Sequence, residues 1–237
     1  MLPKPEQLNK IFYEKCLFYK PKDIVGGDFY WVIDREDSIY WAVIDCTGHG
    51  VPGGFMSMIG NSILNEIVSE QGVEDVNAIL DSMREKVIKS ISGGVENVNE
   101  AERKDGMDVA LCRLDKKTGT FDFAGANLNA WVFQKGELIE VKGDMQPVGV
   151  HKTIIPFQKQ SLSTQKGDVI YIFTDGYPDQ FGGSKFKKFK LQRMRKLLTQ
   201  MQDKTMLEQE TMVAEVFNSW KGENSQTDDV TFIGIKT

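Results

Sequence analysis

The fold is decided by the stretch Ala42-Val43-Ile44-Asp45-Cys46-Thr47-Gly48-His49-Gly50-Val51-Pro52-Gly53-Gly54. An apolar run ends in an aspartate, a glycine-rich turn that carries a histidine follows, and an apolar-striped segment begins near Pro52. This order predicts a strand, a tight turn and a helix. The strand would aim the Asp45 carboxylate, and the glycines would let other groups approach it closely.

The preceding segment predicts the antiparallel partner of that strand. Asp28 follows two glycines and opens an aromatic and β-branched strand over residues 28–33. A turn at residues 36–37 then leads into the strand over residues 39–45, which gives a hairpin. Because the strands of a hairpin run in opposite directions, we expect Asp28 and Asp45 at the same end of the sheet.

The rest of the chain alternates between helical and strand patterns. Apolar spacing predicts helices over residues 52–70, 74–91 and 206–220, with an apolar-striped basic segment over 186–201. Strands are expected over residues 108–114, 120–124, 129–133, 137–141, 169–173 and 230–235, and residues 93–104 read as a polar loop. The order favours one α+β domain with mainly antiparallel sheets. We place this domain at residues 21–237, after an N-terminal linker or helical lead-in at residues 1–20.

Composition limits the class of protein. With 237 residues, 41% hydrophobic content and a net charge of -5, the chain is long enough to bury a core and shows no sign of binding nucleic acid. No apolar run reaches the length of a membrane span, and the polar, proline-broken start is unlike a secretory signal. The three cysteines fit reduced core residues of a cytoplasmic domain. Cys46 as a nucleophile is the alternative interpretation.

Four acidic sites share one local design, in which an aspartate stands beside a turn at the end of a strand. They are Asp28, Asp45, Asp175 before Gly176, and the pair Asp228-Asp229 before the last strand. Each alone reads as a turn residue. If they converge, each pair about 4 Å apart costs about 4 kcal/mol at an effective dielectric of about 20. Convergence therefore requires protons or divalent cations, and all-oxygen ligands suit Mn²⁺ or Mg²⁺. Two such ions serve phosphoryl chemistry.

Two further features admit both a functional and a structural interpretation. His49, between two glycines, is a turn residue or a proton donor to a leaving alkoxide. The basic run over residues 185–196 is a solvated helix face or a docking site for an acidic phosphoprotein.

In combination and order, the motifs resemble the metal-dependent protein serine/threonine phosphatases (PPM type), in the bacterial branch of sporulation and stress-response phosphatases. The resemblance covers residue 18 to the C-terminus. It is carried by residues 21–30, the opening stretch through Met58, Asp105-Gly106-Met107-Asp108, residues 173–183 and residues 227–231. Residues 124–127 also look like a family turn, although the proline-containing continuation is replaced by Leu128-Asn129-Ala130.

The resemblance implies a four-layer α-β-β-α sandwich of two mainly antiparallel sheets flanked by helices. It also implies a role for each acidic site. Asp45 resembles the carboxylate that bridges two metal ions, and Cys46 would add only its backbone carbonyl. Asp175, Asp228 and Asp229 look like further ligands, Asp28 like the aspartate that holds a metal or its water, and Asp105 or Asp108 like ligands of a weaker third ion. No clear match exists to the phosphate-gripping arginine of eukaryotic members, which leaves Lys20 and Lys22 as candidates.

The implied function is hydrolysis of phosphoserine or phosphothreonine on a small bacterial regulatory protein, such as a partner-switch antagonist of an anti-sigma factor, by a metal-activated water. An upstream sensor domain, which in relatives is sometimes membrane-bound, and a homodimer through residues 1–20 are further expectations. Two rival functions stay open at the level of sequence. One is a two-metal phosphohydrolase acting on a small molecule, and the other is a non-catalytic phosphatase-like binding module.

Overall fold

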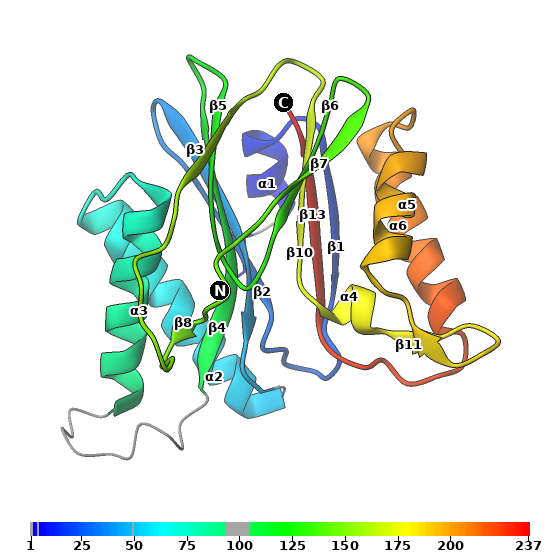
Figure 1. The fold of residues 1–237 in the computed structure, drawn as a ribbon, viewed down its shortest axis with the longest axis horizontal. Coiled ribbons are helices and arrows are strands. Elements are labelled where there is room, and N and C mark those ends of the chain that lie inside the picture. The colour runs from blue at the N-terminus through cyan, green and yellow to red at the C-terminus, as the bar shows by residue number, and fades with distance from the viewer. Residues whose placement is uncertain (1, 4, 49, 93–104) are drawn as a thin grey trace.

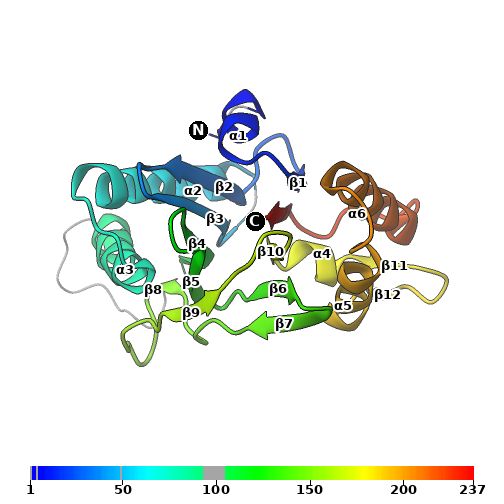
Figure 2. The same ribbon diagram turned by 90° about the horizontal axis from the view of Figure 1, so that it is seen from above.

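Two antiparallel sheets pack face to face, and helices cover both outer faces (Figure 1). The computed structural model describes residues 2–3, 5–48, 50–92 and 105–237. The two packed sheets and the helices on their outer faces confirm the four-layer α-β-β-α sandwich expected from the sequence. The view from above shows the same layers, with α2 and α3 on one side and α5 and α6 on the other (Figure 2).

The first sheet has the strand order β2-β3-β4-β5-β9, with β8 paired to β4. Its strands are β2 (Phe29–Asp34), β3 (Ser38–Cys46), β4 (Gly106–Asp115), β5 (Thr120–Ala126), β8 (Val148–Gly149) and β9 (Gln160–Ser163). The predicted hairpin is present as β2 and β3, which pair antiparallel from Phe29 with Ile44 to Asp34 with Ile39.

The second sheet has the order β1-β13-β10-β6-β7. Its strands are β1 (Lys15–Lys20), β6 (Ala130–Gln134), β7 (Glu137–Val141), β10 (Val169–Phe173) and β13 (Val230–Lys236). The C-terminal strand β13 lies between β1 and β10, so segments from the start, middle and end of the chain form one surface.

Helices α2 (Gly50–Asn65) and α3 (Val76–Ser92) cover the first sheet, with the π-helical turn η1 (Glu66–Glu70) between them. Helices α5 (Leu191–Gln200) and α6 (Met206–Lys221) cover the second sheet. The short helices α1 (Pro5–Ile11) and α4 (Gly176–Asp179) and the small hairpin of β11 (Phe181–Gly182) and β12 (Lys187–Lys188) complete the fold. No helix in the described ranges has the length and apolarity to cross a membrane. The loop predicted at residues 93–104 lies outside the described residues.

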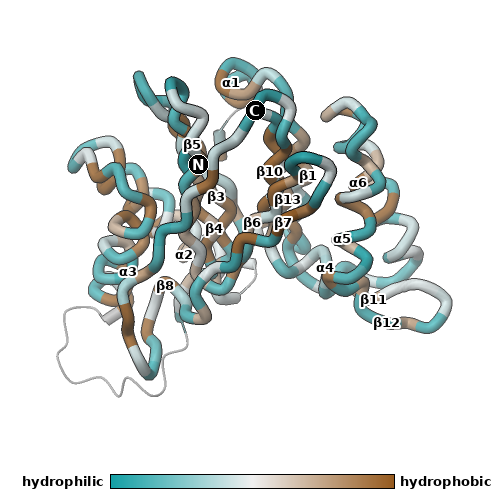
Figure 3. Tube along the Cα trace, turned by 45° about the horizontal axis from the view of Figure 1, so that its top comes forward, coloured by the Kyte–Doolittle hydropathy of each residue, from teal (hydrophilic) through white to brown (hydrophobic). Residues whose placement is uncertain are grey.

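Three apolar layers follow from the alternation of side chains along the strands. On β3, Ala42 and Ile44 face the helices, while Trp41 and Val43 face the second sheet. In the innermost layer, Trp41 and Val43 pack in one cluster with residues of the second sheet such as Ile172 and Ile233. A third layer lies between the second sheet and α5 and α6. Figure 3 shows many of the most hydrophobic residues along the central strands of both sheets.

The predicted boundary at residue 20 differs from the structure. Only residues 5–11 of the expected lead-in are helical, and residues 15–20 form the edge strand β1. This strand pairs with β13 over six residues, from Lys15 with Ile235 to Lys20 with Val230. Leu8 and Phe12 are buried against the layer between the sheets. The segment is therefore packed as part of the domain. Local periodicity did not predict the strand, because its partner β13 lies more than 200 residues away in sequence.

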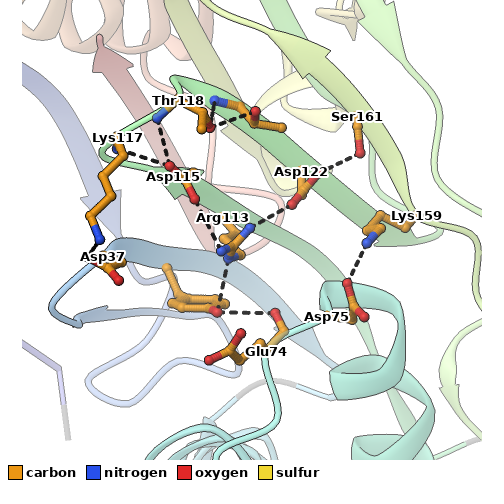
Figure 4. A network of polar contacts seen from close by, with 12 residues as sticks. Asp37, Glu74, Asp75, Arg113, Asp115, Lys117, Thr118, Asp122, Lys159 and Ser161 are labelled. Carbon is orange, nitrogen blue, oxygen red and sulfur yellow. Dashed lines mark hydrogen bonds and ion pairs between the residues drawn. The ribbon is translucent and has the colours of Figure 1, made fainter.

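A polar network fastens the first sheet at the end of β4 (Figure 4). Arg113 bonds to Asp122 on β5 at 3.0 Å and to the Tyr40 hydroxyl on β3 at 3.1 Å. Ser161 on β9 donates to the same aspartate at 2.5 Å. Arg113 lies five residues along β4 from Asp108, a separation of about 17 Å in an extended strand. The network thus stabilises the strand order at the end opposite the acidic residues.

Candidate metal centre

Three of the predicted carboxylates come from neighbouring strands of the first sheet. The register pairs Asp45 with Asp108, and the pairing of Phe29 with Ile44 brings Asp28 beside Asp45. The inward residues of these strands are Tyr30, Val43 and Ala110, two positions away from each aspartate. Since side chains alternate, all three aspartates are on the face toward the second sheet. They form one end of the layer between the sheets.

Asp28 is held by the second sheet. Its carboxylate is 2% exposed and accepts hydrogen bonds from the hydroxyls of Thr174 at 2.7 Å and Thr231 at 3.0 Å. The two threonines are themselves joined, since the backbone N–H of Thr174 donates to the Thr231 carbonyl at 2.9 Å. Asp28 therefore bridges the two sheets of the sandwich.

Asp175 and Asp228 reach the cluster through a close approach of two loops. A Cβ on Gly176 would be 1.8 Å from the carbonyl oxygen of Asp229, so only glycine fits there. This contact places the turn after β10 directly against the turn before β13. Asp175 and Asp228 are consequently adjacent, and both are exposed at the mouth of the site.

Asp229 differs from its neighbour, although the sequence could not separate them. Its side chain is 3% exposed and accepts backbone hydrogen bonds from Lys22 at 2.7 Å and Gly27 at 2.6 Å. The carboxylate is thus occupied in shaping the loop before Asp28. Asp228 is exposed instead, and its negative charge helps to raise the pKa values of Asp28, Asp45 and Asp175.

The pKa values of the cluster record this crowding. Burial, together with the charges of Asp28, Asp175 and Asp108, raises the pKa of Asp45 from 3.8 to about 10. Burial also raises the pKa of Asp28 to about 7, against the opposing effect of the two threonine hydrogen bonds. Partial removal from water and the charges of Asp179 and Asp228 raise the pKa of Asp175, which a hydrogen bond from Asp45 partly offsets. The dominant charge effects on these three groups are repulsive.

The two candidates for a third ion occupy different positions. Asp108 is half-buried, accepts a hydrogen bond from Asn127 at 2.8 Å, and has a pKa raised mainly by burial. It is among the charges that raise the pKa of both Asp45 and Asp175. Asp105 is exposed just before β4 and is not among the largest charge effects on these two groups. Asp108 therefore lies nearer the cluster electrostatically.

Cys46 presents its backbone rather than its thiol. The side chain is 3% exposed, and burial raises the pKa of the thiol so that it stays protonated. Its carbonyl oxygen would be 2.9 Å from a Cβ on Gly27, which shows how closely the loop before β2 approaches the end of β3. The nucleophilic interpretation of Cys46 finds no support in these surroundings.

The remaining predicted residues lie apart from the cluster or outside the description. The ammonium of Lys20 donates to Asn218 at 3.0 Å and lies 5.8 Å from the ring centre of Phe217, so it is engaged with α6. Lys22 contacts the acidic region through its backbone N–H to Asp229. His49 is outside the described residues.

The donor set fits divalent cations of the hard type. The carboxylates of Asp45, Asp175, Asp228 and Asp28 supply oxygen ligands, and their mutual repulsion would be relieved by positive charge. Within the described part of the chain, no three His, Cys, Asp or Glu side chains meet closely enough to form a metal cage. Mg²⁺ commonly binds through one or two carboxylates and keeps several waters, so an open cluster suits it.

Sequence reasoning missed three residues that support the carboxylates. Thr174, Thr231 and Asn127 hold Asp28 or Asp108 by hydrogen bonds. The sequence did carry a signal for the two threonines. Thr174 follows the apolar strand β10 and directly precedes Asp175, and Thr231 lies at the start of the apolar strand β13. Only their inward orientation, which depends on the packing of the sheets, reveals the contact.

Comparison with known proteins agrees with this geometry. The family model of stage II sporulation protein E (SpoIIE) matches residues 35–237. Phosphoserine phosphatase RsbU of Bacillus subtilis (strain 168) is 26% identical over 160 residues, which are 66% of this chain and 44% of RsbU. The chain thus spans less than half the length of that relative.

Two solved structures share the fold. The SiaA-PP2C domain of Pseudomonas aeruginosa superposes with a TM-score of 0.88 and 28% identity, over 100% of this chain and 91% of that one. The PP2C phosphatase domain of SpoIIE from Bacillus subtilis gives a TM-score of 0.74 at 15% identity, over 94% and 63% of the two chains. The chain therefore belongs to the SpoIIE family, in the bacterial branch of the PP2C-type phosphatases.

Proposed function

We propose that this chain hydrolyses phosphoserine or phosphothreonine on a partner protein, with two divalent cations held at the candidate metal centre. One observation supports the proposal above all. Asp28, Asp45 and Asp175 lie close enough to act on one another, and burial, together with repulsion from the neighbouring carboxylates, raises the pKa of Asp45 to about 10. Bound divalent cations would compensate for this repulsion and for the cost of burying the charge.

Each residue then has a distinct part. Asp45, central to the cluster and hydrogen-bonded to Asp175, would be shared between the two ions, with Asp228 beside Asp175 on one of them. The carbonyl of Cys46 and the carboxylate of Asp28 would serve the other. Asp229, bonded to the backbone of residues 22 and 27, would order the loop instead of binding metal.

The ions would supply a water of lowered pKa and positive charge against the phosphate oxygens. The chain supplies orientation, since the threonine hydroxyls hold one oxygen of Asp28 in place. With the thiol of Cys46 protonated and buried, hydrolysis would proceed without a covalent enzyme intermediate. Both Mn²⁺ and Mg²⁺ suit the oxygen donors.

The substrate we propose is a small regulatory phosphoprotein of the partner-switch type. The similarity to RsbU, which is named a phosphoserine phosphatase, supports this class. A purified phosphothreonine peptide and p-nitrophenyl phosphate should both be hydrolysed when Mn²⁺ or Mg²⁺ is added, and neither in a chelator.

The variants Asp45→Asn and Asp175→Asn should lower these rates by about 100-fold or more, as expected for losing an electrostatic group from an active site. Asp203→Asn, an exposed aspartate in the loop between α5 and α6, is the matched control and should retain the wild-type rate. Metal-dependent hydrolysis that survives in both site variants would refute the proposal. A nucleotide hydrolysed faster than any phosphopeptide would favour the small-molecule rival, and absent metal binding by calorimetry would favour the non-catalytic module.

A further inference from the structure

A groove of about 460 Å³ opens directly from the candidate metal centre. It runs between the ends of β6 and β10 on one side and the start of α5 on the other. Asp175 lines it, as does Thr174, whose hydroxyl donates to Asp28. Asn127, which donates to Asp108, lines it as well. The groove is therefore continuous with the carboxylate cluster.

The floor of the groove is apolar. Leu128, Trp131 and Phe173 line it and are nearly buried beneath it. Leu191, at the first position of α5, is 47% exposed at the rim. An apolar side chain of a bound segment would cover this surface, and the removal of apolar surface from water would favour binding.

Lys190 stands at the rim in a conformation that ordinarily belongs to glycine. Its φ of 73° and ψ of 152° lie in a region that is costly for any residue with a Cβ. The surroundings hold it there, because its N–H donates to the Pro178 carbonyl at 2.7 Å and its own carbonyl accepts from Arg193 and Met194. A lysine kept at a strained position beside an active site points to a use for its side chain.

The chain segment that forms one rim of the groove is basic, in contrast to the whole protein and to Asp175 and Asp179 on the groove lining. The chain has a net charge of -5, yet residues 180–202 contain seven lysines and arginines and no acidic residue. Lys188 is paired with Asp179 at 2.6 Å, and Arg195 pairs with Glu140 at 3.4 Å. Among the described residues that line the groove, Lys190 is the one cation, and Asp175 and Asp179 line the same groove. Lys190 offers an acidic segment an attractive contact where the cluster alone would repel it.

We propose that this groove binds the segment next to the phosphorylated residue of the partner protein. An apolar side chain of that segment would lie against Leu128, Trp131 and Leu191, and a neighbouring Asp or Glu would pair with Lys190. The groove thus selects phosphosites flanked by one apolar and one acidic residue. This inference rests on the phosphatase function proposed above.

The test compares three phosphothreonine peptides with p-nitrophenyl phosphate, which is too small to fill the groove. One peptide carries leucine and glutamate beside the phosphothreonine, one replaces the glutamate by lysine, and one replaces the leucine by serine. The wild-type protein should hydrolyse the first peptide with the highest kcat/KM. The advantage over each of the other two should be about fivefold, the size of one partly exposed ion pair or a small apolar contact.

Variants at the rim should change this preference in specific ways. Lys190→Gln should abolish the discrimination between glutamate and lysine, and Lys190→Glu should invert it. Leu191→Ser should abolish the preference for leucine. Lys196→Gln removes the same charge from an exposed position of α5 outside the groove and should keep the wild-type preference.

A stability measurement separates this role from a structural one. Lys190→Gly relieves the backbone strain, so its Tm should equal or exceed that of the wild type while the preference for glutamate is lost. Equal kcat/KM for all three peptides, or an unchanged preference in the Lys190 variants, would overturn the groove assignment and leave the phosphatase function standing. Failure of the wild type to hydrolyse any phosphopeptide in Mn²⁺ or Mg²⁺ would overturn both.

Discussion

Replacing Asp45 by asparagine should stabilise the metal-free protein while it removes activity. The carboxyl of Asp45 has its pKa raised from 3.8 to about 10 by burial and by the charges of Asp28, Asp175 and Asp108. Because the folded-state pKa is above the unfolded one, this group favours folding fully below about pH 4, and the contribution is lost as the pH rises toward about 10. Asparagine keeps the shape and a hydrogen bond to Asp175 but never carries the charge.

The size of the effect follows from the shift. Near pH 7.5 the folded protein keeps a proton that the unfolded chain has released, at a cost of about 1.4 kcal/mol for each pH unit above the unfolded value. The upper limit is therefore about 5 kcal/mol, and penetration of water into the open mouth of the site reduces it to about 2 kcal/mol. For a chain of this size, that corresponds to a rise in Tm of about 4–8 °C.

Thermal unfolding in a chelator and in Mn²⁺, at about pH 5 and about pH 7.5, provides the assay. The wild type should gain more from Mn²⁺ at the higher pH, because the metal replaces protons on the cluster. In the chelator, Asp45→Asn should have a higher Tm than the wild type, and Mn²⁺ should raise its Tm only slightly. The variant should hydrolyse phosphopeptides at least about 100-fold more slowly than the wild type. A lower Tm than the wild type in the chelator near pH 7.5, or a full response to Mn²⁺, would refute the reasoning.

Three further variants separate support from chemistry. Asp229→Asn weakens two backbone hydrogen bonds of a buried carboxylate and should lower the free energy of unfolding by about 2 kcal/mol in urea titrations, whereas the exposed Asp228→Asn should change it little and lose activity instead. Equal destabilisation by both would contradict their distinct roles. Thr174→Val removes a 2.7 Å hydrogen bond to Asp28 and should cost about 1.5–3 kcal/mol, with weaker Mn²⁺ binding in calorimetry. Arg113→Met, in the network at the far end of β4, should cost about 1–3 kcal/mol but keep kcat/KM within about twofold, and a large loss of activity would show that the two ends are coupled.

Local sequence determined the elements and the chemical type of the site. The alternation on β2 and β3 and the spacing on α2 and α3 follow from which residues must leave water, so a single chain displays them. The hairpin also predicts that Asp28 and Asp45 lie at the same end of the sheet, which the pairing of Phe29 with Ile44 confirms. An unbalanced set of strand-end aspartates then indicated oxygen-ligated cations.

Tertiary structure decided the matters that depend on distant partners. The strand β1 needs β13 to be recognised, since its own pattern also suits an amphipathic helix. Asp228 and Asp229 are identical neighbours in sequence, and only the backbone N–H groups of residues 22 and 27 assign one of them to the loop. Thr174 and Thr231 gained their role when the second sheet packed on the first. The strand β1, the distinction between Asp228 and Asp229, and the role of the two threonines share one physical reason. A buried carboxylate or strand edge needs hydrogen-bond partners, and those partners come from distant parts of the chain that only packing brings together.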